Sequence, residues 1–269
     1  MALINRPERD AHWYHRDGRS CHSVIASSTG LPRQTSLADA RKMNLIPSVT
    51  NVLGMKAKPA LMTWLQDNAI ISALNTPRNA GEPEDQWHSR IAEESNKIAR
   101  EAAEWGALIH WQIEQFAIGG AFMGTGEILD YVAGYEKWHR ENIEKVISAE
   151  QSVVGIMGYA GRLDLHAMMV GGRRAVIDAK SQKLKGKAKA NFYLEWSMQL
   201  AAYADCLREP GDPLPLLISV IIPSDVPGPV QVKIWDNGEA ALEAFNACYK
   251  LWCFDKNYTP RPHEYPPNH

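Results

Sequence analysis

The sequence predicts an α+β or mixed α/β fold in which helices flank a central mixed β-sheet. From residue 86 onward the patterns follow the order helix, three strands, helix, two strands and helix. Some of these strands are separated by short turns and others by a helix, which indicates one sheet with mixed connections. The chain has 269 residues, of which 45% are hydrophobic, and its nine Trp and nine Tyr supply material for a core.

The first 84 residues are expected to form a hairpin and a helical segment. They precede a core over residues 85–269, and we expect both parts to form one compact unit. The hairpin is predicted from residues 12–26, where the turn pair Asp17-Gly18 lies between polar and aromatic flanks.

Three helices should follow this hairpin. The first covers residues 35–43 and is capped by Thr35 or Ser36, and the second covers residues 47–54. The third covers residues 59–74, because a proline suits the first turn of a helix. Its apolar side is formed by Leu61, Trp64, Leu65 and Ile70.

Two long helices are expected before the sheet. Residues 76–85 contain two prolines and a glycine and interrupt the helical pattern. A helix is then predicted from about residue 86 to 118, and a second one over roughly residues 127–147. The glycine-rich stretch 119–126 separates them and lacks the lysine of a phosphate-binding loop.

The pattern changes to short β-rich segments at Glu150. Strands are predicted over residues 153–157, 162–170, 175–180, 216–223 and 230–235, and helices over residues 191–208 and 237–256. Gly171-Gly172 is expected to be a two-residue hairpin turn between the second and third strands. The proline-rich end of the chain is expected to be irregular.

Charge and cysteine content narrow the functional classes. The net charge of −2 does not by itself indicate a nucleic-acid partner, so any basic surface must be local. The four cysteines include no closely spaced pair, which favours reduced thiols in a cytoplasmic protein. No signal peptide or membrane span is expected, because no apolar run is long enough.

Two aspartates and a lysine are predicted to converge on one side of the sheet. Asp164 lies within one strand, and Asp178 and Lys180 lie two apart near the end of the next, so they share a face. Carboxylate oxygens suit Mg²⁺ or Mn²⁺, and a lysine beside the metal can stabilise developing negative charge. The alternative interpretation is a solvated Asp–Lys pair at the edge of the sheet.

These motifs resemble a known family. The order GYAGRLDL, VIDAKS, QLAAYA is similar to the RecB-like branch of the PD-(D/E)XK nucleases, which includes the mitochondrial genome maintenance exonuclease and many phage enzymes. The resemblance covers most of residues 46–235. It implies a restriction-endonuclease-like αβββαβ core with an N-terminal helical elaboration, in which the segment IPSVTNVL packs over the cleft and helps to hold single-stranded DNA.

The resemblance assigns roles to individual residues. Asp164, Asp178, the peptide carbonyl of Ala179 and a helical His110 would be the metal ligands, and Lys180 would be the catalytic lysine. Glu150 matches an acidic position of the family less firmly, and either assists the site or stabilises the fold.

Contacts with DNA are expected around this site. Gln199 and Tyr203 lie four apart on one helix face and would line the site, although a core Tyr203 and a surface Gln199 are the alternative. Ser181 follows the catalytic lysine and would touch a phosphate. Positive charge for phosphates would come from Arg162, Lys183, Lys185, Lys187 and Lys189. Stacking on unpaired bases is a further possibility for Trp105, Trp111, Tyr193 and Trp196.

The predicted function is a Mg²⁺- or Mn²⁺-dependent DNA exonuclease acting on DNA ends or single strands, in recombination, repair or degradation, and phage-encoded by resemblance. The alternatives are a structure-specific DNA endonuclease and a non-catalytic DNA-binding protein on a nuclease fold. The cysteine spacing predicts no iron–sulfur cluster. A zinc site formed by His12, His15, Cys21 and His22 is disfavoured, because the spacing of these residues is irregular.

Overall fold

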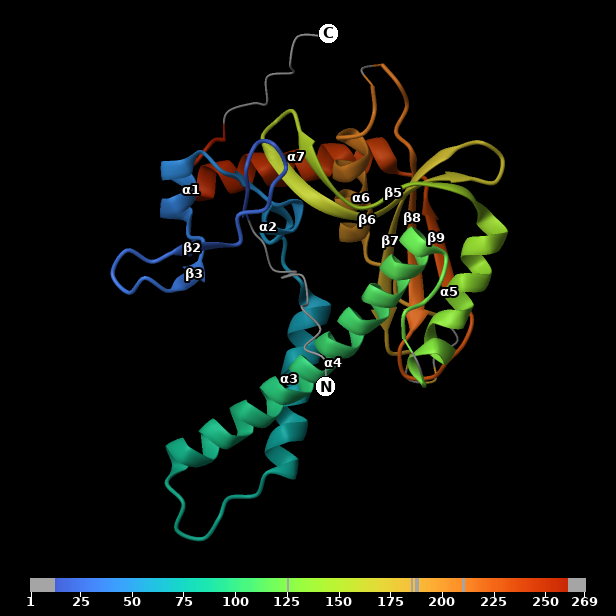
Figure 1. Cartoon of the computed structure of the whole chain (residues 1–269). Helices are drawn as coiled ribbons and strands as arrows, with labels where there is room; N and C mark the ends of the chain where they lie inside the picture. Colours follow the sequence, from blue (N-terminus) through green and yellow to red (C-terminus); the bar gives the residue numbers. More distant parts are fainter. Residues whose placement is uncertain (1–12, 125, 185, 187–188, 210, 261–269) are drawn as a thin grey trace.

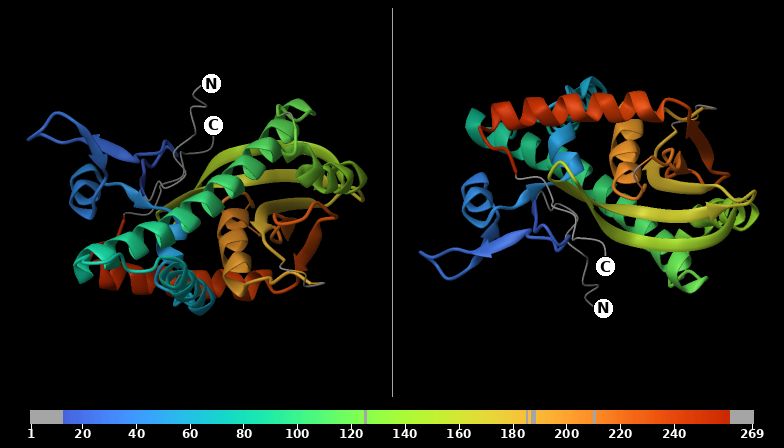
Figure 2. Two further views of the ribbon diagram at one scale, coloured as in Figure 1. Left: turned by 90° about the horizontal axis from the view of Figure 1, so that it is seen from below. Right: turned by 90° about the horizontal axis from the view of Figure 1, so that it is seen from above.

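A five-stranded mixed sheet forms the centre of the molecule, flanked by helices on both faces, which confirms the predicted α+β class (Figures 1 and 2). The computed structural model describes residues 13–260, except 125, 185, 187–188 and 210. The strands are β5 (Ile143–Gly155), β6 (Tyr159–Met169), β7 (Arg174–Gln182), β8 (Leu216–Pro223) and β9 (Gln231–Trp235), and they lie side by side in this order. Neighbours are antiparallel except β7 and β8, which are parallel.

Four helices cover the two faces of this sheet. They are α4 (Glu84–Gly119), α5 (Ile128–Asn142), α6 (Leu194–Asp205) and α7 (Gly238–Asp255). Helices α4 and α5 pack a hydrophobic cluster on one face, and α6 and α7 pack a second cluster on the other. The crossover from β7 to β8 passes through α6, as a parallel pair requires. Because β8 has a cluster on both sides, its apolar run is buried almost throughout.

The boundary between α5 and β5 differs from our prediction. A helix to residue 147 was expected, but α5 ends at Asn142 and β5 begins at Ile143, ten residues before the predicted strand. Residues of this stretch pair with β6, for example Ile143 with Met169 and Val146 with Ala167. Pairing with a distant strand therefore overrides the local helical pattern, which no short window of sequence reveals.

The other core elements lie close to their predicted positions. Strand β6 begins three residues earlier than expected, and β7 extends to Gln182. The Gly171-Gly172 turn between them is confirmed: both glycines have positive φ, and the N–H of Gly172 donates to the carbonyl of Met169 at 2.9 Å. Helix α6 is shorter than predicted at both ends.

The N-terminal part contains two small pairs of strands in place of one simple hairpin. They are β1 (Trp13–Tyr14) with β4 (Ile46–Pro47), and β2 (Ser23–Ile25) with β3 (Pro32–Gln34). The predicted turn at Asp17-Gly18 is present and brings Tyr14 to Ser20. However, the strands on either side of this turn pair elsewhere, and residue 12 lies outside the described residues.

Two short helices follow in this part of the chain, α1 (Leu37–Met43) and α2 (Val49–Leu53). Ser36 is the N-cap of α1, and it forms a capping box with Asp39. Helix α2 and Trp13 share the hydrophobic cluster of α6 and α7.

Helix α3 (Pro59–Asn75) packs against α4, and the two form an arm that projects from the body (Figure 1). The predicted apolar side of α3 does not reach a core: Leu61, Leu65 and Ile70 are exposed, and its buried residues are Asn68 and Ser72. Within the part of the chain that the structure describes, no helix has the length and apolar character needed to cross a membrane.

Candidate active site

Strands β6 and β7 separate at Asp164, and this separation creates the site. Their ladder runs from Met168 and Arg174 to Leu165 and Ile177, and it stops one residue before Asp164. The Asp164 carboxylate replaces the lost ladder bond, because its Oδ2 accepts the backbone N–H of Ala179 at 2.9 Å. The N–H and C=O of one strand residue point toward the same neighbour, so the Ala179 carbonyl faces this opening too.

Asp178 lies in the buried central part of β7 with only 2% of its surface exposed. Its Oδ1 accepts a hydrogen bond from Lys180 Nζ at 2.6 Å, and the lysine side chain is 28% exposed. Burial raises the pKa of the Asp178 carboxyl above its ordinary value, and the Lys180 ammonium partly offsets the rise. The alternative interpretation of a solvated pair at the sheet edge is therefore wrong, because the carboxylate is almost completely buried.

Helix α6 contributes Gln199 and Tyr203 from one face. Gln199 Nε2 donates to Asp178 Oδ1 at 3.3 Å and to the Tyr203 hydroxyl at 3.4 Å. Tyr203 is buried, and burial raises the pKa of its hydroxyl well above the ordinary value. Its ring lies directly against Gly161 of β6, where a Cβ atom would overlap the ring. Gly161 thus allows α6 to bring Gln199 close to Asp178.

Helix α4 brings His110 to the same opening. The Nδ1 of His110 lies 3.6 Å from Asp164 Oδ2, and both side chains are largely buried. Four residues before His110, Gly106 packs against β7 so closely that an added Cβ would lie 2.8 Å from the Ser181 hydroxyl oxygen. The close approach at Gly106 sets the distance of α4 from the sheet, and with it the position of His110.

One cavity of about 270 Å³ connects most of the predicted residues. Its lining includes His110, Glu150, Arg162, Asp164, Lys180, Gln199 and Tyr203. Asp178 is not part of the surface of this cavity, but it is bonded to Lys180 and Gln199, which are. The structure thus brings together residues from α4, β5, β6, β7 and α6 that are up to 93 positions apart, from His110 to Tyr203.

Arg162 is bound to two carboxylates at the edge of this cavity. Its Nε lies 2.7 Å from Glu150 Oε2, and a terminal nitrogen lies 3.7 Å from Glu114 Oε1. Glu150 has the left-handed conformation, with φ of 51°, which is uncommon for a residue other than glycine. Its neighbours Ala149 and Gln151 pair with Leu165 and Leu163 of β6, and Glu150 itself lines the cavity.

Several predicted contact residues lie outside the cavity lining. Ser181 faces Gly106 of α4, and Lys183 is exposed beyond the end of β7. Lys185 and Lys187 lie outside the described residues. Trp105 donates to the carbonyl of Ser224 and packs edge-on against Tyr131, so its role is structural in this arrangement. The proposed stacking of the aromatic residues stays a prediction.

Sequence reasoning missed residues that the fold adds to the site. Glu114 is one helical turn after His110 on α4, and this spacing alone could have identified it. The N-terminal part adds polar side chains to the cavity lining, namely Tyr14, Ser20, His22, Ser48 and Thr50. Ser48 and Thr50 belong to the segment IPSVTNVL, which the resemblance placed over the cleft, whereas no local pattern identifies Tyr14, Ser20 and His22.

The donor types at this site fit a hard divalent cation. Among the described residues, no three His, Cys, Asp or Glu side chains form a preformed metal cluster, and the two aspartates accept hydrogen bonds from the Ala179 N–H and from Lys180. However, Oδ2 of the buried Asp178 has no hydrogen-bond partner among the described residues. A buried carboxylate oxygen without a partner is costly, and a cation would remove that cost.

A scan of the chain against protein-family models gives no match, and a search of curated proteins gives none either. The resemblance of the short motifs to RecB-like nucleases therefore stays a prediction. The case for a function rests on the residues of the site and their geometry.

Proposed function

We propose that the protein is a metal-dependent DNA nuclease of the RecB-like PD-(D/E)XK type, acting as an exonuclease on DNA ends or single strands. The observation that carries this proposal is the buried Asp178 carboxylate, which has one oxygen without a hydrogen-bond partner among the described residues and the other bound to Lys180. Asp164 and His110 lie beside it on separate elements. A structural ion pair needs none of these additional ligand-type side chains.

The metal would be held by Asp164, Asp178, His110 and the carbonyl of Ala179. Carboxylate and carbonyl oxygens are the ligands that Mg²⁺ and Mn²⁺ prefer, and an imidazole nitrogen is accepted by Mn²⁺. When bound, such an ion polarises a phosphoryl oxygen and makes a water molecule more acidic. The Ala179 N–H orients Asp164, and the Gln199 side chain orients Asp178. Hydrogen bonds from neighbouring groups therefore fix the orientation of both carboxylate ligands.

Lys180 is the residue placed to act on the reacting phosphate. Its ammonium lines the cavity while Asp178 holds it from behind. In that position it can stabilise the negative charge that grows on the phosphoryl oxygens, or orient the attacking water. A positively charged side chain held in place by a buried carboxylate needs little reorganisation at the moment of reaction.

The cavity itself favours a single strand or a DNA end over an intact duplex. Its volume is about 270 Å³, and residues of β1, α2, α4 and α6 surround it. A duplex is much wider than such a space, since its major groove alone is about 12 Å wide.

The test is hydrolysis of three DNA substrates by the purified full chain: end-labelled single-stranded, end-labelled linear duplex and closed circular DNA. We expect progressive shortening of linear DNA with Mg²⁺ or Mn²⁺, no reaction with EDTA and intact circles. Nicking of circles would favour the endonuclease alternative instead. Binding of DNA without cleavage under any metal would overturn the proposal in favour of a DNA-binding protein.

A further inference from the structure

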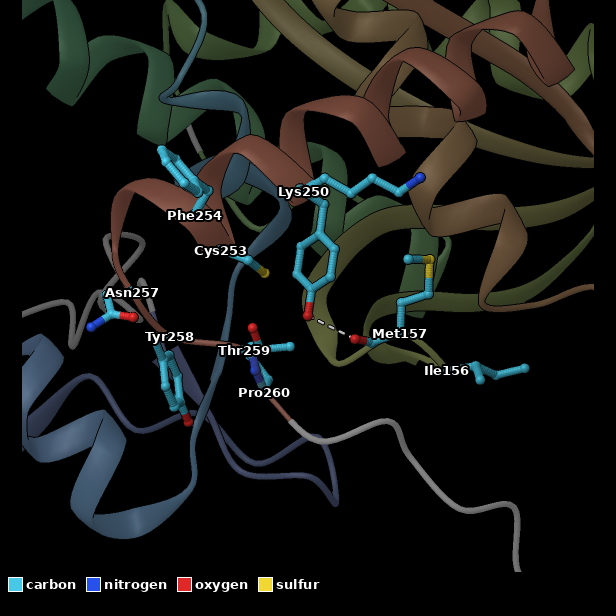
Figure 3. A pocket seen from close by; sticks show the side chains of 10 residues that line it. Ile156, Met157, Lys250, Cys253, Phe254, Asn257, Tyr258, Thr259 and Pro260 are labelled. Carbon is cyan, nitrogen blue, oxygen red and sulfur yellow. Dashed lines mark hydrogen bonds between the residues drawn. The ribbon is translucent and has the colours of Figure 1, made fainter.

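A second concave surface lies at the C-terminal end of α7, and it shares no lining residue with the candidate active site. It has a volume of about 800 Å³ and lies between the turn that joins β5 to β6 and the last turn of α7. We call it the α7 groove, lined by Ile156, Met157, Tyr249, Lys250, Cys253, Phe254 and residues 257–260 (Figure 3). Nothing in the proposed nuclease activity requires this groove.

The lining of the α7 groove is apolar, and much of it is exposed. Ile156 is 50% exposed and Phe254 is 85% exposed. The two walls are tied together, because the Tyr249 hydroxyl donates to the carbonyl of Met157 at 2.7 Å. Cys253 points into the space between the walls in Figure 3. A preformed apolar groove with exposed hydrophobic walls is typical of a binding site.

The charges around the α7 groove are positive. Lys250 is part of the lining, and no Asp or Glu is found among the described lining residues. Arg41 donates to the carbonyl of Lys256 at 2.6 Å, which places its guanidinium at the end of α7. Burial raises the pKa of Tyr249 and of Tyr258, and the nearby charge of Arg16 acts in the opposite direction on both. Lys250 and Arg41 therefore border an apolar space, and the acidic Asp255 at the end of α7 is paired with Lys256 at 2.6 Å.

We propose that the α7 groove binds an acidic, apolar peptide segment of a partner protein. An apolar side chain of the peptide fills the space between the β5–β6 turn and α7, and its carboxylates pair with Lys250 and Arg41. The polar atoms of Asn257 and Thr259 lie in the same lining and can bond the peptide backbone. The aromatic residues of the groove lie on the α7 side, while the opposite wall is formed by the aliphatic Ile156 and Met157, which suits an apolar peptide side chain better than a row of stacked bases.

The test is a fluorescence-anisotropy titration of the full chain with a labelled peptide of four aspartates followed by leucine and phenylalanine. We expect saturable binding that Lys250→Glu and Ile156→Glu each weaken at least about tenfold. The matched controls Lys145→Glu and Ile147→Glu change exposed residues outside the groove and should leave binding unchanged.

Three outcomes would overturn this proposal. The first is binding that is equal for a peptide with lysines in place of the aspartates, and the second is binding that both groove variants leave intact. The third is that the peptide does not bind, whereas labelled dodecanoate or a single-stranded oligonucleotide does. Binding of that other ligand would then be lost in the Lys250→Glu and Ile156→Glu variants. DNA hydrolysis is measured separately and is expected to be unchanged by Lys250→Glu, so failure of either proposal is distinguishable from failure of the other.

Discussion

The buried carboxylate of Asp178 is the residue whose environment is hardest to explain without a bound cation. It is almost fully removed from water, it lies close to a second carboxylate, and among the residues that the structure describes only Lys180 and Gln199 bond it. Burying a charge in this way costs stability unless the charge is fully paired. A buried and incompletely paired carboxylate of this kind is expected at functional sites, where binding or catalysis depends on it.

Asp178→Asn tests how this carboxylate contributes to stability. Burial raises the pKa of Asp178, so its protonated form is favoured by folding. The contribution of Asp178 to the free energy of unfolding is fully present below the pKa of the unfolded state, near 3.8. It is lost as the pH rises through the higher pKa of the folded state. Without metal, Asp178→Asn should therefore be about as stable as the wild type at pH 4 but more stable at pH 8, by about 1–3 kcal/mol.

Urea denaturation in EDTA at the two pH values measures this difference. Adding Mg²⁺ should stabilise the wild type and leave Asp178→Asn unchanged, because only the wild type retains the ligand. Asp130→Asn, at an exposed position of α5, is the matched control. A variant that is less stable than the wild type at pH 8 would contradict this account of Asp178.

At the scale of elements, the contact between β6 and α6 depends on one glycine. Gly161→Ala would force a methyl group into the ring of Tyr203 and displace α6. We expect a loss of about 1–3 kcal/mol in the free energy of unfolding, as for other overpacked sites. Thermal denaturation measures it, with Gly119→Ala as the control because nothing lies near an added Cβ there.

A matching second variant locates the cause of that loss. Tyr203→Leu in the Gly161→Ala background removes the ring that the methyl group meets, so part of the lost stability should return. Equal destabilisation of the single and double variants would show that the ring is not what excludes a side chain at residue 161.

The position of α4 determines whether His110 reaches the metal site. His110→Ala should lower the apparent affinity for Mn²⁺ at least about tenfold, because one ligand beside Asp164 is lost. Isothermal titration with Mn²⁺ measures the affinity directly. His88→Ala lies on the exposed part of the same helix and should bind Mn²⁺ like the wild type. Equal affinities for the two variants would remove His110 from the ligand set.

At the scale of the whole molecule, a net charge of −2 means that any DNA must be held by local positive charge. Lys183 and Lys189 are exposed between β7 and α6, beside the candidate site. Their double replacement by Ala should weaken binding of single-stranded DNA and reduce the slope of log K against log salt by about 1.4. Filter binding at several NaCl concentrations measures the slope. An unchanged slope would place the phosphate contacts elsewhere.

The order of the core elements could be predicted because it depends on local patterns. The apolar run of β8, the alternation in β6 and the glycine turn before β7 each identify their element within a few residues. The boundary between α5 and β5 could not be predicted, since residues 143–147 become a strand only by pairing with β6. Most of the arm helix α3 was predicted correctly, but not which of its residues are buried.

The candidate site was predictable only where its residues are close in sequence. The spacing of Asp178 and Lys180 placed them on one face, and that of Gln199 and Tyr203 did the same. The segment IPSVTNVL covers Ser48 and Thr50, but Tyr14, Ser20 and His22 lie more than 90 positions before Asp164 and carry no motif. Glu150 is paired with Arg162 and has a left-handed backbone, and no sequence pattern indicates either feature.

The most direct test of the central claim is the rate of Mg²⁺-dependent hydrolysis of linear DNA by Lys180→Ala. Lys137→Ala, which removes an exposed lysine of α5, is measured beside it. We predict that Lys180→Ala loses at least about 10²-fold in rate while folding and binding Mg²⁺ normally, and that Lys137→Ala retains the wild-type rate. Hydrolysis by Lys180→Ala at the wild-type rate would contradict the assignment of this site as the catalytic centre.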